Sequence, residues 1–160
     1  MAYKVFLSHS THDQNLVIAL AKILSQFGVE VFVAEWYLDP GQKIDKKILS
    51  SIDSSDCIVV LLTQNGMRSA WVQQEIGCAI KSTKPIIPLV EKGISSSELG
   101  MLQLKEYIEY DPHHPQQALN KITTYVKSLK LGKTIKEKTL LVAGGTLAFL
   151  VLLMLSGEEK

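Results

Sequence analysis

This sequence lacks the features that mark several large classes of protein. Its 160 residues carry a net charge of only +1, so no excess of basic charge favours binding to nucleic acid. The motif G-x-G-x-x-G and the Walker A motif are both absent, which argues against a Rossmann dehydrogenase and a P-loop nucleotidase. Internal repeats and low-complexity segments are also absent, which leaves an ordinary domain with an appendage.

Cysteine is scarce, and its positions favour a reduced environment. The two cysteines, Cys57 and Cys78, lie inside apolar runs and not at the spacings of a metal site or a disulfide framework. We interpret them as small core residues of a cytosolic domain. The N-terminus enters a strand-like run directly, so we expect no secretory signal.

The histidines and serines form no recognisable catalytic or metal-binding pattern. His113 and His114 are adjacent in a turn bounded by prolines, whereas a structural zinc site needs four converging ligands. His9 and His12 are expected at the surface, and we predict no metal site. Ser8-His9 lacks a G-x-S-x-G elbow, which argues against a serine hydrolase.

One long hydrophobic run is present near the C-terminus. Segment 139–156 carries no charge, and its length is just sufficient to span a bilayer core of about 30 Å. Lysines precede it, and the positive-inside rule places them in the cytoplasm. We therefore expect a domain over 1–131 facing the cytoplasm, a basic linker over 132–138 and a single-pass C-terminal transmembrane anchor over 139–156. The alternative is a helix that packs on the domain or pairs with another chain.

The first 131 residues alternate between β-rich runs and helical patterns, which is typical of an α/β domain with a parallel sheet. The strands are expected at Lys4–Ser8, Glu30–Val33, Asp56–Leu62, Pro85–Val90 and Glu106–Tyr110. The helices are expected at Asp13–Phe27, Ile44–Ser54, Ser69–Lys81, Ser97–Leu102 and Pro115–Leu131. The predicted fold is a flavodoxin-like five-stranded parallel sheet in the order 2-1-3-4-5, with helices on both faces, plus the C-terminal transmembrane helix.

In such sheets ligands bind beyond the carboxyl ends of the strands, where the strand order reverses. The loops Ser8–Asp13, Glu35–Lys43 and Thr63–Arg68 are expected to converge there. The third loop leads into a helix for which Ser69 is a suitable N-cap.

Trp71 and Glu75 lie four residues apart on that helix, so they are neighbours on one flank of its apolar face. A partly desolvated carboxylate beside an indole suits a flat aromatic ligand. The alternative is an exposed glutamate paired with Arg68 or Lys81. A single carboxylate argues against two-carboxylate glycoside hydrolysis. It suits a cationic leaving group, such as the nicotinamide of NAD, because one carboxylate can stabilise an oxocarbenium-like transition state.

Several motifs together resemble the Toll/interleukin-1 receptor (TIR) domain family, over about residues 1–131 and in particular its prokaryotic NAD-cleaving branch. The segment Lys4–Ser10, which covers the first strand and the start of the first loop, is similar to box 1 of that family, and Leu38–Gly41 is similar to its BB loop. Ser69–Ile76 resembles the helix S/D-x-W-x-x-x-E-[IL] of the NAD-cleaving members, and Pro85–Leu89 resembles their fourth strand.

This resemblance implies an NAD glycohydrolase or cyclase that uses NAD as its substrate and needs no cofactor. The family's catalytic glutamate falls on Glu75, and its stacking aromatic falls on Trp71. The first-loop wall of the pocket falls on Ser8, His9 and Ser10, although some eukaryotic members have arginine in place of His9.

The resemblance also implies self-assembly or binding to another TIR protein. The BB loop that gates the pocket contains Asp39, and its assembly contacts fall on Leu38, Pro40 and Gly41. Many bacterial and archaeal members serve in antiphage defence.

Two other interpretations remain open. A TIR domain can act as a scaffold that binds other TIR domains without chemistry, although scaffolding alone requires neither Glu75 nor Trp71. A relative of the nucleoside deoxyribosyltransferases would share the sheet type and the carboxylate chemistry on nucleosides.

Overall fold

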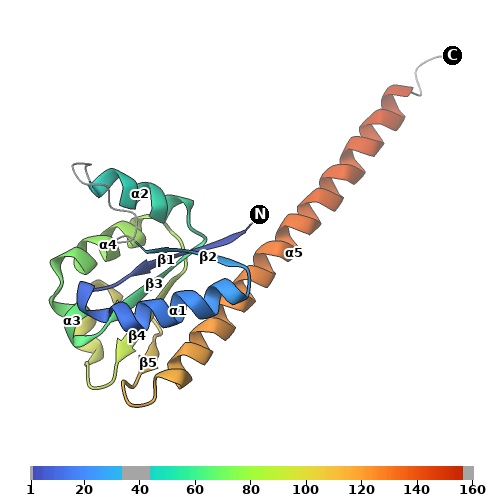
Figure 1. Ribbon diagram of the computed structural model, residues 1–160. Helices are drawn as coiled ribbons and strands as arrows, with labels where there is room; N and C mark the ends of the chain where they lie inside the picture. Colours follow the sequence, from blue (N-terminus) through green and yellow to red (C-terminus); the bar gives the residue numbers. More distant parts are fainter. Residues whose placement is uncertain (1, 34–43, 157–160) are drawn as a thin grey trace. The chain divides into compact units, whose positions relative to one another are not determined.

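The computed structural model describes residues 2–33 and 44–156, with side chains for 2–33 and 46–141 (Figure 1). Its five-stranded sheet has the order β2-β1-β3-β4-β5 with every neighbouring pair parallel, so the predicted sheet topology is confirmed. The strands are β1 (Tyr3–Ser8), β2 (Val29–Val33), β3 (Cys57–Leu62), β4 (Ile86–Glu91) and β5 (Ile108–Tyr110).

Each predicted helix is present, and the described residues also form two short helices that were not predicted. The α-helices are α1 (Gln14–Gln26), α2 (Ile44–Ser54), α3 (Gln64–Arg68), α4 (Ala70–Lys81) and α5 (Pro115–Ser156). The 3-10 helices are η1 (Thr11–Asp13) and η3 (Ser96–Leu102). Both η1 and α3 lie in segments predicted as loops, because a single helical turn is too short to show a periodic apolar pattern.

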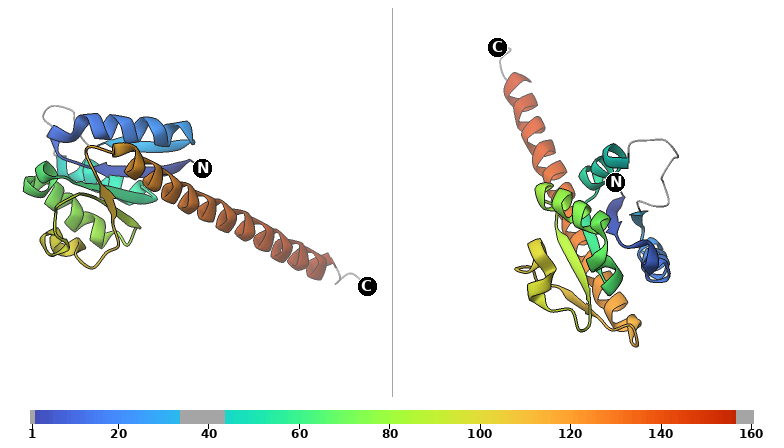
Figure 2. Two further views of the ribbon diagram at one scale, coloured as in Figure 1. Left: turned by 90° about the horizontal axis from the view of Figure 1, so that it is seen from below. Right: turned by 90° about the vertical axis from the view of Figure 1, so that its left-hand side faces the viewer.

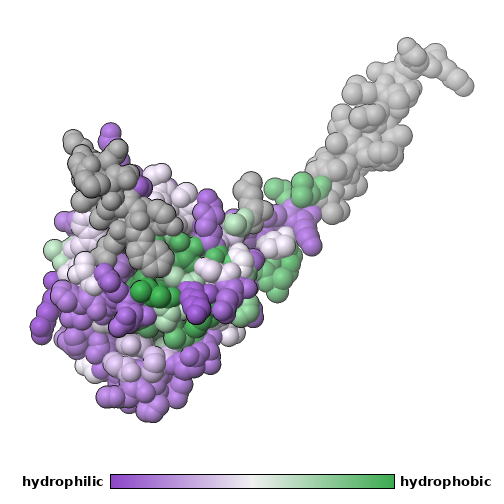
Figure 3. Space-filling view, in the orientation of Figure 1, coloured by the Kyte–Doolittle hydropathy of each residue, from purple (hydrophilic) through white to green (hydrophobic). Residues whose placement is uncertain are grey.

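The sheet is covered by helices on both faces, with α1 on one face and α4 on the other (Figure 2). On the α4 face, Phe6, Ile58 and Val60 from the strands share one core cluster with Ile52 of α2 and Ile76 of α4. All six residues of β3 are buried, as a central strand covered on both faces requires. On the face of the domain that Figure 3 shows, hydrophilic residues predominate at the surface.

Local sequence explains where several elements begin and end. The Ser69 hydroxyl accepts a hydrogen bond from the Val72 amide at 3.3 Å, which confirms the predicted N-cap of α4. Gly28 follows α1 with a φ of +67°, a left-handed conformation that glycine adopts without steric cost. Gly66 of α3 is also required, because a Cβ there would lie 2.4 Å from the Leu61 carbonyl oxygen.

The chain divides into two compact units, Met1–Thr123 and Thr124–Lys160. The boundary falls within α5, so one helix contributes to both units. The helix predicted over Pro115–Leu131 continues to Ser156 without a break over 132–138.

The prediction of a transmembrane helix over 139–156 is wrong, and so is the prediction of a single-pass membrane localisation. Over residues 2–33 and 46–141, whose side chains the structure describes, no helix is both long enough and apolar enough to cross a bilayer. The uncharged run is not a separate segment but the continuation of α5.

Candidate functional site

The centre of the candidate site is a hydrogen bond between the ends of two elements. Ser8 is the last residue of β1, and Glu75 lies in the second turn of α4. The Ser8 hydroxyl donates a hydrogen bond to Glu75 Oε2. Only 1% of Ser8 and 3% of Glu75 is exposed, so Glu75 is not the solvated helix glutamate that the sequence also allowed.

The burial of Glu75 follows from its position on the helix. The buried residues of α4 are Val72, Glu75, Ile76 and Ala79, which recur at the spacing of one helix face. Glu75 therefore occupies a position where this pattern normally places an apolar residue. On β1, Ser8 lies two residues after Phe6, so the alternation of the strand places both side chains on the α4 side of the sheet.

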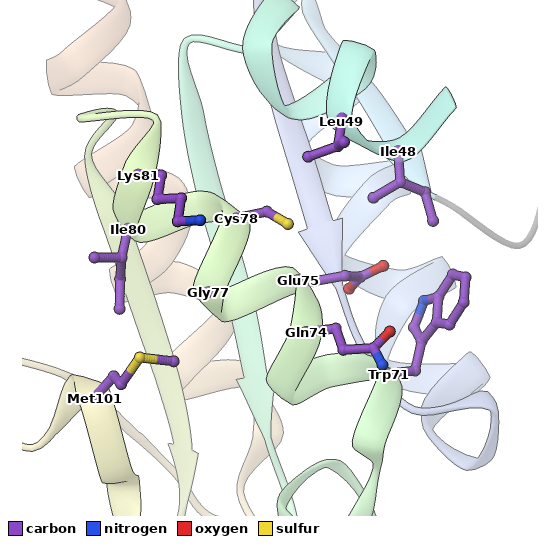
Figure 4. Close-up of a pocket in the computed structure, with 10 residues that line it drawn as sticks. All are labelled: Ile48, Leu49, Trp71, Gln74, Glu75, Gly77, Cys78, Ile80, Lys81 and Met101. Carbon is purple, nitrogen blue, oxygen red and sulfur yellow. The ribbon is translucent and has the colours of Figure 1, made fainter. Parts of the chain in front are cut away.

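Trp71 lies one helical turn before Glu75 and is half-buried. Its indole packs against the core cluster that includes Phe6 and Ile48, so it serves the core as well as the site. Figure 4 shows the indole and the Glu75 carboxylate on the same side of α4, next to Ile48 of α2. The predicted proximity of Trp71 and Glu75 is confirmed by this arrangement.

A pocket of about 620 Å³ opens beside Glu75 along α4. Its walls come from α2, α4 and η3, and most of the lining is apolar (Figure 4). The charged lining residues are Glu75 and Lys81. The lining residues are Ile48, Leu49, Trp71, Gln74, Glu75, Gly77, Cys78, Ile80, Lys81 and Met101. A mostly apolar pocket with one buried carboxylate suits a largely apolar, flat group that carries or develops positive charge.

The other residues of the first loop occupy different positions. His9 is 4% exposed and Ser10 is 5% exposed, so the expectation of a surface His9 is wrong. Ser10 accepts a hydrogen bond from the His12 amide at 3.4 Å and caps η1. Neither His9 nor Ser10 belongs to the described lining of the pocket.

The predicted residues of the second loop lie outside the described residues. These residues are Leu38, Asp39, Pro40 and Gly41.

Sequence reasoning missed most of the pocket lining. Gln74 and Cys78 share a helical stripe with Trp71, and this spacing of three and four residues was a usable signal. Ile48, Leu49 and Met101 come from elements distant in the sequence, so only the packing of the helices brings them to the pocket.

The cysteines differ in their surroundings. Cys57 in β3 is fully buried, and burial is the main cause that raises the pKa of its thiol to about 12. Cys78 lines the pocket and is partly exposed. Over the described ranges, no three His, Cys, Asp or Glu side chains are grouped so that they could hold a metal ion.

Comparisons with known proteins give a consistent result. The family model for the TIR domain matches residues 5–123. The chain is 30% identical over 95 residues to AbTIR of Acinetobacter baumannii, described as a 2' cyclic ADP-D-ribose synthase. The aligned region covers 56% of this chain and 35% of that protein. It is also 31% identical over 75 residues to PdTIR of Paracoccus denitrificans, described as an NAD(+) hydrolase. That aligned region covers 46% of this chain and 25% of that protein. The chain thus spans about a third or less of the length of these relatives.

The fold also matches that of a solved receptor domain. The TIR domain of the Toll-related receptor TRR-2 from Hydra magnipapillata superimposes with a TM-score of 0.65 at 17% identity. The match covers 78% of this chain and 98% of that domain.

Proposed function

We propose that this chain, which belongs to the TIR domain family, is an enzyme and cleaves the nicotinamide–ribose bond of NAD. The single observation that carries the proposal is the buried Glu75, which accepts a hydrogen bond from Ser8 at the wall of an apolar pocket. The names of AbTIR and PdTIR support the same substrate.

The proposed reaction uses the positive charge of the substrate. When the C1'–N bond breaks, its electron pair goes to the nicotinamide nitrogen, which becomes neutral, and positive charge develops on the ribose. The Glu75 carboxylate stabilises that charge, and such an interaction is stronger in a water-poor site than in bulk water. Attack by water gives ADP-ribose and one proton, whereas attack by a hydroxyl of the same ADP-ribose gives a cyclic product and one proton.

We further propose that Trp71 binds the substrate by stacking against a planar base. An indole is well suited to this role, because aromatic surfaces add affinity beyond the area that they bury. In the same proposal Ser8, His9 and Ser10 lie at the first-loop side of the substrate, beyond the described lining of this pocket, and Asp39 lies on the loop that gates it. No metal or other cofactor takes part in this reaction scheme.

Activation by self-assembly is a separate part of the proposal. Contacts of Leu38, Pro40 and Gly41 with a second TIR domain would complete or open the site. The resemblance of Leu38–Gly41 to the BB loop supports this idea. The alternative function, a non-catalytic TIR–TIR scaffold, would show the same association without product.

The test is an incubation of the full chain with NAD at several protein concentrations, followed by chromatography of the products. We expect release of nicotinamide together with ADP-ribose or a cyclic isomer, and no release from Glu75→Gln. A folded wild-type chain that associates but releases no nicotinamide would support the scaffold instead.

A role in antiphage defence would follow from NAD depletion or from the cyclic product. Expression in a bacterial host challenged with phage tests it, with Glu75→Gln as the matched control. Protection that requires Glu75 supports the role, and equal survival with both variants contradicts it.

A further inference from the structure

The contact between Ser8 and Glu75 joins residues that are 67 positions apart in the chain. Both side chains are almost fully buried. A carboxylate placed among apolar groups is unfavourable unless hydrogen-bond donors compensate for the lost water. The Ser8 hydroxyl supplies one such donor.

The backbone around Ser8 gives that donor a fixed position. Ser8 ends β1, and its register opposite Val60 of β3 is defined by the sheet. Its side chain has a single rotatable bond to the hydroxyl oxygen. In contrast, the glutamate side chain has three rotatable bonds, so a rigid donor restricts the orientation of the carboxylate.

We propose that Ser8 is a positioning residue for Glu75, whose hydroxyl holds the carboxylate in its ionised form and in the orientation that faces the scissile bond. This inference rests on the proposed cleavage of NAD. It also differs from the role that the family resemblance implies for Ser8, which is a direct contact to the substrate as part of the first-loop wall.

Among the described residues, the titratable groups near this pair come from the residue after β1 and from α4. His9 directly follows Ser8 at the end of β1, and Cys78 and Lys81 lie with Glu75 on α4 and line the same pocket. The elements α2 and η3 contribute no titratable side chain to the described lining, only Ile48, Leu49 and Met101. All of these groups are unchanged when Ser8 is replaced, so a difference between wild type and variant reports on the hydroxyl.

The experiment compares Ser8→Ala with Ser55→Ala in the full chain. Ser55 is also a buried serine, 2% exposed, but its hydroxyl donates to the Ser51 carbonyl oxygen at 2.6 Å. For Ser8→Ala we expect kcat to fall by about 10-fold to 100-fold, with KM within about twofold of wild type, because only the geometry at the reacting bond is lost. For Ser55→Ala we expect an unchanged kcat.

The pH profile separates a positioning role from loss of packing. A hydroxyl that donates to a carboxylate favours the ionised form. We therefore expect the acid limb of the kcat profile to move to higher pH in Ser8→Ala. The profile of Ser55→Ala should coincide with that of wild type.

A measurement that needs no activity is the melting temperature as a function of pH. The hydrogen bond stabilises the ionised carboxylate, so the difference between wild type and Ser8→Ala should be largest near neutral pH, about 4 °C. The difference should shrink as Glu75 becomes protonated in acid. A difference that is the same at every pH would overturn the proposal, because it would indicate packing alone.

The outcomes also separate this inference from the proposed function. A wild-type chain that releases no nicotinamide overturns both. If wild type is active, Glu75→Gln is inactive and Ser8→Ala keeps its kcat, the positioning role alone is overturned. A raised KM with unchanged kcat would assign Ser8 to direct substrate binding. If Ser8→Ala does not fold, Ser8→Cys is measured instead, because its thiol is a weak donor of similar size. For Ser8→Cys we expect a smaller loss of kcat and a smaller move of the acid limb than for Ser8→Ala.

Discussion

Thr63 and Asp13 connect the loops that follow β3 and β1. The Thr63 hydroxyl donates a hydrogen bond of 2.6 Å to Asp13 Oδ2, and the same hydroxyl accepts a hydrogen bond of 3.0 Å from the Gly66 amide. One side chain therefore caps α3 and joins α3 to the start of α1. These loops flank the point where the strand order reverses, so this pair stabilises the edge of the sheet on which the candidate site is built.

Thr63→Val should destabilise the domain without changing its shape. Valine removes the donor to Asp13 and leaves the buried Gly66 amide without its partner, which typically costs about 1–3 kcal/mol. Urea unfolding measures the loss. Thr63→Ser keeps the hydroxyl and should retain most of the stability, and a valine variant as stable as wild type would show that the pair is unimportant.

Glu75→Gln should abolish nicotinamide release while the fold remains intact. Glutamine has nearly the same volume, and its amide oxygen can still accept the hydrogen bond from Ser8. The negative charge is lost, so the rate should fall by about 100-fold or more. Chromatography of nicotinamide and a melting curve are measured on the same sample, and a folded variant with wild-type turnover would contradict the assignment.

Trp71→Ala should raise KM for NAD by about fivefold or more, because a stacking surface contributes on the order of 1 kcal/mol. It should also lower the melting temperature, since the indole packs on the core cluster. Trp71→Phe keeps an aromatic ring and should lose less of both. If both variants keep the wild-type KM and only stability falls, Trp71 is a core residue and not a binding residue.

The two cysteines should differ in reactivity. At pH 8 iodoacetamide should alkylate Cys78 and spare Cys57, because burial raises the pKa of the Cys57 thiol to about 12 and only the thiolate reacts. Mass spectrometry of the labelled peptides gives the two rates, and labelling in urea should make them similar.

Bound NAD should slow the alkylation of Cys78, because Cys78 lines the same pocket as Glu75 and Trp71. Glu75→Gln, which keeps the pocket but not the charge, allows the protection to be measured without turnover. Equal labelling of Cys78 with and without NAD would place the substrate outside this pocket.

Specific activity should rise with protein concentration if assembly completes the site. Pro40→Ala and Gly41→Ala should reduce that rise, because proline and glycine have backbone preferences that alanine lacks and because Leu38–Gly41 resembles the BB loop. Light scattering at each concentration reports the association. A specific activity that is constant from dilute monomer upward would indicate a site that one chain completes by itself.

Much of the fold could be predicted from local sequence. The pattern of residues predicted a strand over Asp56–Leu62 and an N-cap at Ser69, and the structure has β3 and the start of α4 there. In each case the decisive interactions join residues a few positions apart, and such interactions can be inferred from spacing alone. The alternation of strands and helices then limited the sheet to a small number of topologies.

Local composition was misleading where a residue's environment depends on distant parts of the chain. The uncharged run after Thr139 suggested a separate membrane anchor, but it continues a helix that begins at Pro115. His9 was expected at the surface because histidine is often exposed, yet the packing around the end of β1 buries it.

By itself, the sequence determined the strands, the longer helices and the closeness of Trp71 to Glu75, because these depend on periodicity and on short-range contacts. The tertiary structure decided that Glu75 is buried, that Ser8 is its hydrogen-bond donor and that α2, α4 and η3 enclose a pocket beside it. The physical reason is that side-chain groups from distant segments meet only after strand register and helix packing have fixed their backbones. A hydrogen bond or a cavity wall depends on differences of a few tenths of an ångström, which no spacing in the sequence encodes.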